Sequence, residues 1–127
     1  GCKNILVTGD LNTTLCATKD RWNYLTYNHR KSRAVTRNWI DEGDFIDAHR
    51  AFYPEDKKLY TYRKKEKDEI VIQSRLDYSL ASRELFNLIK RVKMVNISQA
   101  ISDHNGIKTT VKIEKFEDRP RTFRANP

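Results

Sequence analysis

The sequence predicts a mixed α/β fold of the α+β kind, in which a mostly antiparallel or mixed sheet carries flanking helices. Three patterns support this fold class. Apolar residues alternate with polar ones from Ile107 to Ile113, which is the period of a half-buried strand. Two β-rich runs, 59–62 and 70–72, flank a charged segment as in a hairpin. The stretch 32–42 instead has the spacing of an amphipathic helix.

The first predicted element is a short strand. Ile5-Leu6-Val7 is apolar and partly β-branched, and Gly9 follows as a turn, so we expect a buried strand that ends at Gly9. Asp10 and Asn12 then stand at the carboxyl end of this strand, where a rigid element can position functional side chains. Asp and Asn are also common turn and capping residues, so a purely structural role is the alternative for this segment.

A polar loop and a helix follow this strand. The loop, 13–29, carries scattered aromatic side chains, which either stack on nucleic-acid bases or anchor the loop to the domain. The helix is expected over 32–42, with Ser32 as its N-cap and Gly43 as its C-cap. Phe45-Ile46 should then form a short strand, and Asp47 should cap the turn that follows it.

The hairpin has a charged tip at 63–69, which either grips a phosphate backbone or is a solvated turn. The next strand begins near Arg75 and alternates so that Asp77 faces away from its apolar side. Ser82 should open a helix that includes Ile89. Lys90 and Arg91 would lie at the C-terminal end of this helix, where the helix dipole favours positive charge. The chain then returns through a strand to the polar turn 102–106 and the last strand.

Composition favours a polyanionic partner and an intracellular setting. Lys and Arg number 25 against 17 Asp and Glu, for a formal net charge of +8, which favours nucleic acid. Cys2 and Cys16 have neither metal-ligand spacing nor a disulfide framework, so we expect reduced thiols. The sequence has no membrane-span or signal-peptide pattern, so we expect a soluble protein. Neither His29 nor His49 has a partner at metal spacing, and we expect neither to be functional.

Three short motifs, each beside a predicted strand, carry a family resemblance. They are Gly9-Asp10-Leu11-Asn12, Arg75-Leu76-Asp77-Tyr78 and Ser102-Asp103-His104. In this order, they resemble the carboxyl-terminal half of the endonuclease/exonuclease/phosphatase superfamily, and most closely its apurinic endonucleases and the endonucleases of LINE-type retrotransposons. The segments 47–53 and 60–62 add to the resemblance.

The resemblance implies a domain organisation. Residues 1–115 would form one half of a four-layer α/β/β/α sandwich. Residues 116–127 look like the extended linker that runs from a retrotransposon endonuclease towards its reverse transcriptase.

The resemblance also implies a role for each motif residue. Asp10 matches the aspartate that orients or deprotonates the attacking water, and Asn12 matches the asparagine that holds the scissile phosphate or the metal-bound water. Asp77 matches the carboxylate that pairs with the final histidine, His104, which contacts a phosphoryl oxygen. Asp103 matches the aspartate near the metal. These residue types suit the reaction, because attack on a phosphodiester needs an aimed water, a cation and a hydrogen-bond donor to the phosphoryl oxygens.

The expected cofactor is Mg²⁺ or Mn²⁺, bound weakly by this chain alone. In the family, the amino-terminal half supplies a glutamate that binds the metal, and this glutamate cannot be placed in the sequence. The chain starts at a strand without an initiator Met, so we expect it to be cut from a longer polypeptide. Half of a sandwich would expose an apolar sheet face, so we expect either a homodimer or a complex with a chain that carries the missing half.

Two functions remain open at this stage. The first is part of a Mg²⁺-dependent DNA endonuclease that nicks a target site, weak or inactive without the amino-terminal half and nuclear when it acts on DNA. The second is a non-catalytic nucleic-acid-binding or structural fragment that has kept the motifs by descent. A phosphatase for small or lipid phosphates is a third possibility, which basic clusters such as Lys57-Lys58 and 63–67 disfavour.

Overall fold

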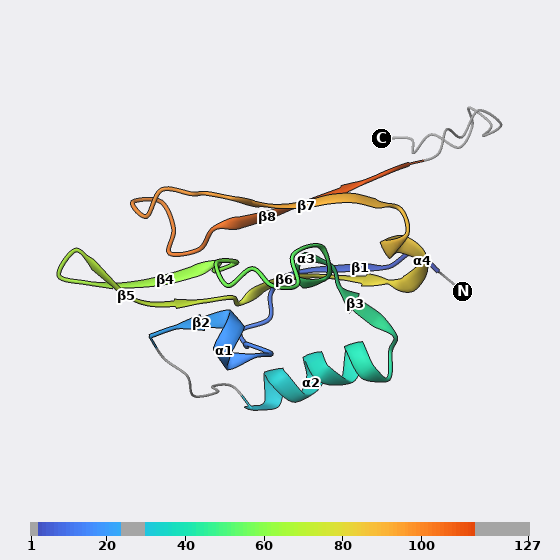
Figure 1. Cartoon of the computed structure of the whole chain (residues 1–127), viewed down its shortest axis with the longest axis horizontal. Coiled ribbons are helices and arrows are strands. Elements are labelled where there is room, and N and C mark those ends of the chain that lie inside the picture. Colours follow the sequence, from blue (N-terminus) through green and yellow to red (C-terminus); the bar gives the residue numbers. More distant parts are fainter. Residues whose placement is uncertain (1–2, 24–29, 114–127) are drawn as a thin grey trace, which may run out of the picture.

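A three-stranded antiparallel sheet, β1-β6-β3, lies at the centre of the computed structural model (Figure 1). Its strands are β1 (Leu6–Asp10), β6 (Asp77–Ser82) and β3 (Phe45–Asp47). The structure describes residues 3–23 and 30–113, and over these residues antiparallel sheets and short helices make an α+β fold, as predicted. Cys2, His29 and the predicted linker at 116–127 lie outside the described residues.

The predicted charged hairpin forms, but its charged residues are mostly strand. β4 (Tyr62–Glu66) pairs with β5 (Glu69–Ser74), and β5 also pairs with the short edge strand β2 (Arg21–Trp22). Only Lys67 and Asp68 form the turn, and both have positive φ angles of 50° and 64°. Two left-handed residues are typical of the tight turn that matches the twist of a two-stranded ribbon.

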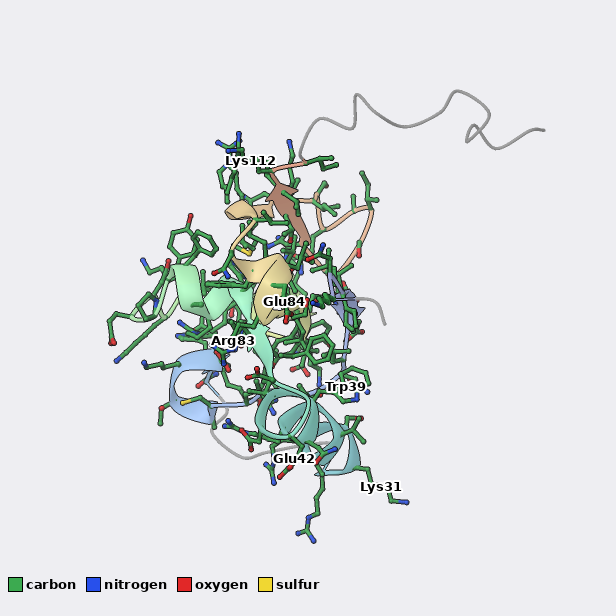
Figure 2. All side chains as sticks on the ribbon, turned by 90° about the vertical axis from the view of Figure 1, so that its right-hand side faces the viewer. Lys31, Trp39, Glu42, Arg83, Glu84 and Lys112 are labelled. Carbon is green, nitrogen blue, oxygen red and sulfur yellow. The ribbon has the colours of Figure 1, made fainter. Side chains whose placement is uncertain are left out.

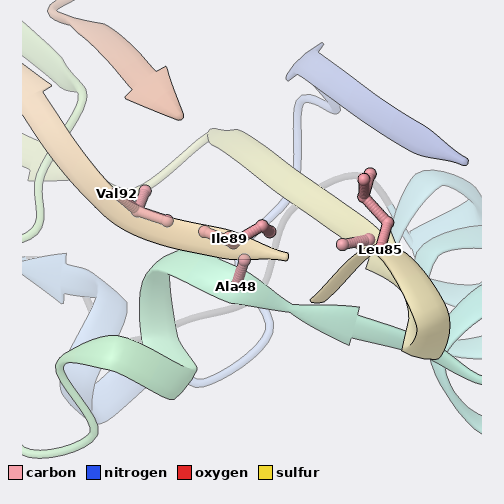
Figure 3. Packing of buried hydrophobic residues seen from close by; sticks show 5 residues of the cluster. Ala48, Leu85, Ile89 and Val92 are labelled. Carbon is pink, nitrogen blue, oxygen red and sulfur yellow. The ribbon is translucent and has the colours of Figure 1, made fainter. Parts of the chain in front are cut away.

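A second hairpin covers one face of the central sheet. It consists of β7 (Ile89–Val95) and β8 (Gly106–Val111), and the Ser79 hydroxyl of β6 lies 2.8 Å from the Thr109 hydroxyl of β8. Between the two layers lies an apolar cluster, part of which Figure 3 shows, made of Ala48, Ala81, Leu85, Ile89 and Val92. Two sheets therefore face each other within this one chain.

Helices cover the opposite face of the central sheet. Figure 1 shows α1 (Ala17–Asp20) and α2 (Arg30–Asp41) on the side away from β7 and β8. There the buried residues Leu15, Tyr78 and Leu80 form a second apolar cluster, against which Ile40 of α2 packs. β6 is consequently buried on both faces, because Ala81 points into one cluster and Leu80 into the other.

The helix predicted over 32–42 forms with different ends. α2 begins at Arg30, so Ser32 is not its N-cap; the Ser32 carbonyl instead accepts a hydrogen bond from the Thr36 hydroxyl at 2.8 Å. At the other end Asp44, with a φ of 57°, adopts the left-handed conformation that was expected of Gly43. Gly43 is needed for a different reason, because a Cβ atom there would lie 2.7 Å from the Trp39 carbonyl oxygen.

The helix predicted after Ser82 is much shorter than expected. Ser82 does cap α4 (Arg83–Phe86), since its hydroxyl accepts a hydrogen bond from the Leu85 amide. Ile89, Lys90 and Arg91 belong to β7 and not to the helix. Pairing with β8, which lies later in the chain, overrides the local helical spacing. The other predicted cap, Asp47, does begin α3 (Ala48–Phe52).

The first strand is less buried than predicted. β1 lies at the edge of the central sheet, and the side chains of Ile5 and Leu6 are 39% and 37% exposed. On α2, Val35 and Trp39 are also exposed, and Figure 2 shows Trp39 and Lys31 at the opposite end of the molecule from Lys112. Among the described residues, no helix has the length and apolar character required to cross a membrane.

Candidate active site

Asp10, Asp77 and His104 come together at one end of the central sheet. The Nδ1 atom of His104 lies 2.7 Å from Oδ2 of Asp77, and its Nε2 atom lies 3.8 Å from Oδ2 of Asp10. One potential ligand atom from each of the three residues falls within 4.8 Å of the other two. The three residues come from three separate motifs, and the cluster is therefore built by the fold.

Strand pairing brings the two aspartates face to face. β1 and β6 are antiparallel neighbours, and Asp10 is directly opposite Asp77 in their register. The Thr61 hydroxyl, which is fully buried, accepts hydrogen bonds at 3.0 Å from the amides of both Leu76 and Asp77. These bonds hold the backbone at the start of β6, so the Asp77 carboxylate is positioned before any substrate binds.

His104 is positioned by the loop between β7 and β8. Its backbone pairs with Tyr62 in an isolated bridge, and its amide donates a hydrogen bond to the Ser102 hydroxyl at 3.0 Å. The Tyr62 ring packs against the imidazole with ring centroids 5.3 Å apart. With Nδ1 held by Asp77, the second ring nitrogen is directed towards Asp10.

Asn12 lies in the same cavity as Asp10 and His104. The cavity has a volume of about 500 Å³, and Tyr62 and Lys64 also line it. Asn12 adopts a left-handed φ of 53°, and its backbone N–H donates a 2.8 Å hydrogen bond to Oδ1 of Asp10. This local turn brings both side chains to the cavity, where a phosphodiester could meet them.

Asp103 is the predicted site residue that the structure does not bring into the cluster. Its side chain is exposed, and its backbone carbonyl accepts a hydrogen bond from the Arg63 amide at 3.0 Å. Asp77 takes the third place in the cluster, next to Asp10 and His104. The motif predicted Asp103 as the metal residue, but the structure leaves it out of the group of potential ligands.

The donor set fits a magnesium ion only loosely. Mg²⁺ prefers oxygen ligands and commonly uses one or two carboxylates together with substrate phosphates. Asp10 offers such a carboxylate, with its side chain 46% exposed. Asp77 is 16% exposed and already engaged by His104, so it is less available to a metal. Asp10 is thus the main residue that would hold a cation, with the substrate completing its coordination.

No sequence pattern indicated the buried ion-pair network that is centred on Arg75, two residues before Asp77. Arg75 is 1% exposed, and its guanidinium donates hydrogen bonds to both carboxylate oxygens of Asp20, at 2.9 and 3.1 Å. It also donates to both carboxylate oxygens of Asp47, at 3.0 and 2.8 Å. Arg50 adds a 2.6 Å bond to Asp20, and the Arg75 guanidinium lies 4.5 Å from the centre of the Tyr78 ring. The Arg-Leu-Asp-Tyr motif was a signal for this site, but it did not show that its arginine is buried.

Electrostatics stabilise the charged forms in this network. Burial opposes ionisation of Asp20, but hydrogen bonds and charge from Arg75 outweigh it and lower the pKa of Asp20. Burial likewise opposes the charge of Arg75, but Asp47 and Asp20 outweigh it and raise the pKa of Arg75. His49 packs beside this network, and burial, with help from the Arg75 charge, lowers its pKa to about 4. His49 is therefore neutral near pH 7.

Two comparisons with known proteins found no match. No protein-family model matches the chain, and no curated protein matches it significantly. The functional interpretation therefore depends on the geometry of the cluster and on the chemistry of its residues.

The buried network makes Arg75 a residue on which stability depends. We expect Arg75→Met to lower the free energy of unfolding by about 3–5 kcal/mol, because it leaves the Asp20 carboxylate buried without its main partner. Urea titration followed by circular dichroism measures this change. The matched control is Arg83→Met, which breaks the exposed Arg83–Asp44 ion pair and should leave stability nearly unchanged. Equal effects of the two substitutions would contradict this role of Arg75.

His49 should make stability depend on pH between about 4 and 6.5. Its pKa is lower in the folded state than in the unfolded chain, so the unfolded chain binds the additional proton as the pH falls. The free energy of unfolding should then decrease by about 3 kcal/mol from pH 7 to pH 4 through this group. Urea titrations over this range should show a flatter profile for His49→Gln. An unchanged profile in that variant would rule out His49 as the source.

Proposed function

We propose that this chain is the carboxyl-terminal half of a Mg²⁺-dependent DNA endonuclease of the endonuclease/exonuclease/phosphatase type, of the kind found in LINE-type retrotransposons. The observation that carries the proposal is the contact of His104 with Asp77, 27 residues apart in the chain, directly beside Asp10. A histidine fixed by one carboxylate and facing a second one suits phosphodiester hydrolysis. The formal net charge of +8 suits a DNA partner.

Each residue has a defined part in the proposed reaction. Asn12 holds the scissile phosphate, and Asp10 accepts a proton from the water that attacks phosphorus. As the new P–O bond forms, one ester P–O bond breaks, and the leaving oxygen takes up a proton. His104 Nε2 donates to a non-bridging oxygen, where negative charge grows in the transition state, and Asp77 keeps the ring aligned. Asp10 would also hold Mg²⁺, which would supply further positive charge near the phosphate.

A non-catalytic nucleic-acid-binding fragment is the second candidate. The observation that favours it is the small number of accessible carboxylates: Asp77 is engaged by His104, and Asp103 lies outside the cluster. Such a module would bind DNA without cleaving it. Cleavage and binding therefore have to be measured separately.

Plasmid nicking in Mg²⁺ or Mn²⁺ tests the proposed reaction. We expect His104→Ala and Asp10→Ala each to lower the nicking rate by about 100-fold or more, because each removes a group that acts on the phosphate or the water. The matched control is Asp41→Ala, which changes an exposed carboxylate at the end of α2 and should leave the rate unchanged.

Two outcomes would contradict the nuclease proposal. One is nicking that persists in both His104→Ala and Asp10→Ala, which would assign the activity to another site or another protein. The other is a folded chain that never nicks, alone or mixed with the amino-terminal half of a nuclease of this class. Salt-sensitive DNA binding in that folded chain would favour the non-catalytic candidate.

We also propose that a second polypeptide covers the exposed apolar residues of α2 and of the segment 5–6 at the start of β1, either another copy of this chain or a chain that carries the missing half. Ile5, Leu6, Val35 and Trp39 are all at least 36% exposed, and water contact with such side chains forgoes roughly 25 cal/mol per Å². Size-exclusion chromatography with light scattering at micromolar concentration should give a dimer mass for the chain alone. A stable monomer, which stays monomeric when the amino-terminal half is added, would contradict this proposal.

A further inference from the structure

A cavity larger than the one that holds the Asp-His cluster lies elsewhere on the described part of the chain. Its volume is about 1100 Å³, and it lies against the other face of the β2-β5-β4 sheet. Cross-strand pairs define the two faces, because paired residues point to the same side of a sheet. Tyr62 pairs with Ser74 on the face of the cluster, whereas Trp22 and Arg63 both pair with Gln73 on the opposite face.

The two cavities meet at the edge strand β2. Arg21 lines both of them, and Trp22 follows it on the side of the larger cavity.

The larger cavity is cationic. Its basic lining residues are Arg21, Lys57, Lys58 and Arg63, and among the described residues that line it none is acidic. Lys57 and Lys58 are exposed, and neither ammonium group forms an ion pair within the part of the chain that the structure describes. A ligand with several negative charges would therefore meet Lys57 and Lys58 without displacing an ion pair of either lysine.

Aromatic and amide side chains complement these charges. Trp22 is 45% exposed, so part of its indole is available to a planar ligand, and Tyr60 also lines the cavity. Gln73 and Asn96 contribute amide groups, which can donate and accept hydrogen bonds. Phosphate-binding cations beside an exposed aromatic ring are the combination by which proteins hold single-stranded nucleic acid.

We propose that this cavity holds unpaired nucleotides of the strand that is cut, adjacent to the phosphate at Asp10 and His104. A base stacks on Trp22, and the phosphates of the same strand lie against Lys57 and Lys58. The bases are unpaired because only a base released from its duplex can present its face to the indole. The cavity exceeds the roughly 300–1,000 Å³ typical of pockets for one drug-sized ligand, so it has space for more than one nucleotide. This inference rests on the proposed nuclease function, which supplies the neighbouring phosphate.

Binding without cleavage tests the inference separately from the reaction. The probe is a fluorescein-labelled oligothymidine of eight nucleotides, and its binding to the full chain is followed by fluorescence anisotropy in EDTA. We expect Trp22→Ala to weaken binding by roughly 5- to 150-fold, the effect of losing one stacked base. Trp22→Phe should retain most of the affinity, because it keeps an aromatic face. The matched control is Phe52→Ala, which removes an exposed aromatic ring of α3 that lines neither this cavity nor the one at the cluster.

The salt dependence gives a second measure. Replacing both Lys57 and Lys58 with Gln should lower the slope of log K against log salt by about 1.4, if each lysine meets one phosphate of a single strand. Replacing Lys31 and Lys112, which are exposed elsewhere, should change the overall charge equally while lowering the slope less.

The outcomes separate this inference from the nuclease proposal. Equal affinities of Trp22→Ala and Phe52→Ala, in proteins shown by circular dichroism to be folded, would overturn the inference even if plasmid nicking occurs. A duplex probe bound as tightly as the single strand, with no dependence on Trp22, would also overturn it. Loss of oligothymidine binding in Trp22→Ala would support the cavity as a binding site even where nicking is absent, in which case the proposed reaction alone would fail.

Discussion

The double contact of Arg75 with Asp20 and Asp47 is the interaction on which the rest of the structure depends. One guanidinium connects three parts of the chain: the end of α1, the junction of β3 with α3, and the segment that leads into β6. A buried charge without partners costs several kcal/mol, so these segments are stable only when they are assembled together. The Arg75 amide also donates to the Asp20 carbonyl at 2.7 Å, which adds a backbone bond to the ionic ones.

The ion pairs of Arg75 also help to position the candidate active site, because Asp77 lies only two residues further along the chain. Arg75 and the Thr61 hydroxyl hold the chain on either side of Leu76, and Asp77 follows at once with its carboxylate against His104. An imidazole held by a fixed carboxylate needs little rearrangement when it donates to a phosphoryl oxygen, and such preorganisation is the usual source of transition-state stabilisation. The scaffold and the proposed chemistry thus share one short segment of sequence.

Local patterns in the sequence predicted much of this fold, but not the interactions that organise it. The hairpin of β4 and β5, the last strand and the caps at Asp47 and Ser82 each have a signal within a few residues, and all of them form. The helix expected to reach Arg91 fails because β7 pairs with a strand that lies later in the chain. The burial of Arg75 could not be predicted in this way, since its two carboxylate partners lie 55 and 28 residues away. Of the candidate site residues, the motifs predicted those that meet in space, except that Asp103 remains outside the cluster.

The two cavities differ in their carboxylates, and this difference fits the proposed division between binding and reaction. Asp10 lines the smaller cavity together with Arg21 and Lys64, whereas no carboxylate is among the described residues that line the larger one. Two carboxylates face each other at the cluster, and they repel a phosphodiester unless a cation or other contacts overcome the repulsion. The neighbouring cavity has basic residues, an exposed indole and, among its described lining residues, no carboxylate. Binding energy gained there by a flanking part of the strand can hold the phosphate against the aspartates, which is how contacts remote from the reacting bond contribute to catalysis. Arg21, which borders both cavities, is the point at which the two effects would be coupled.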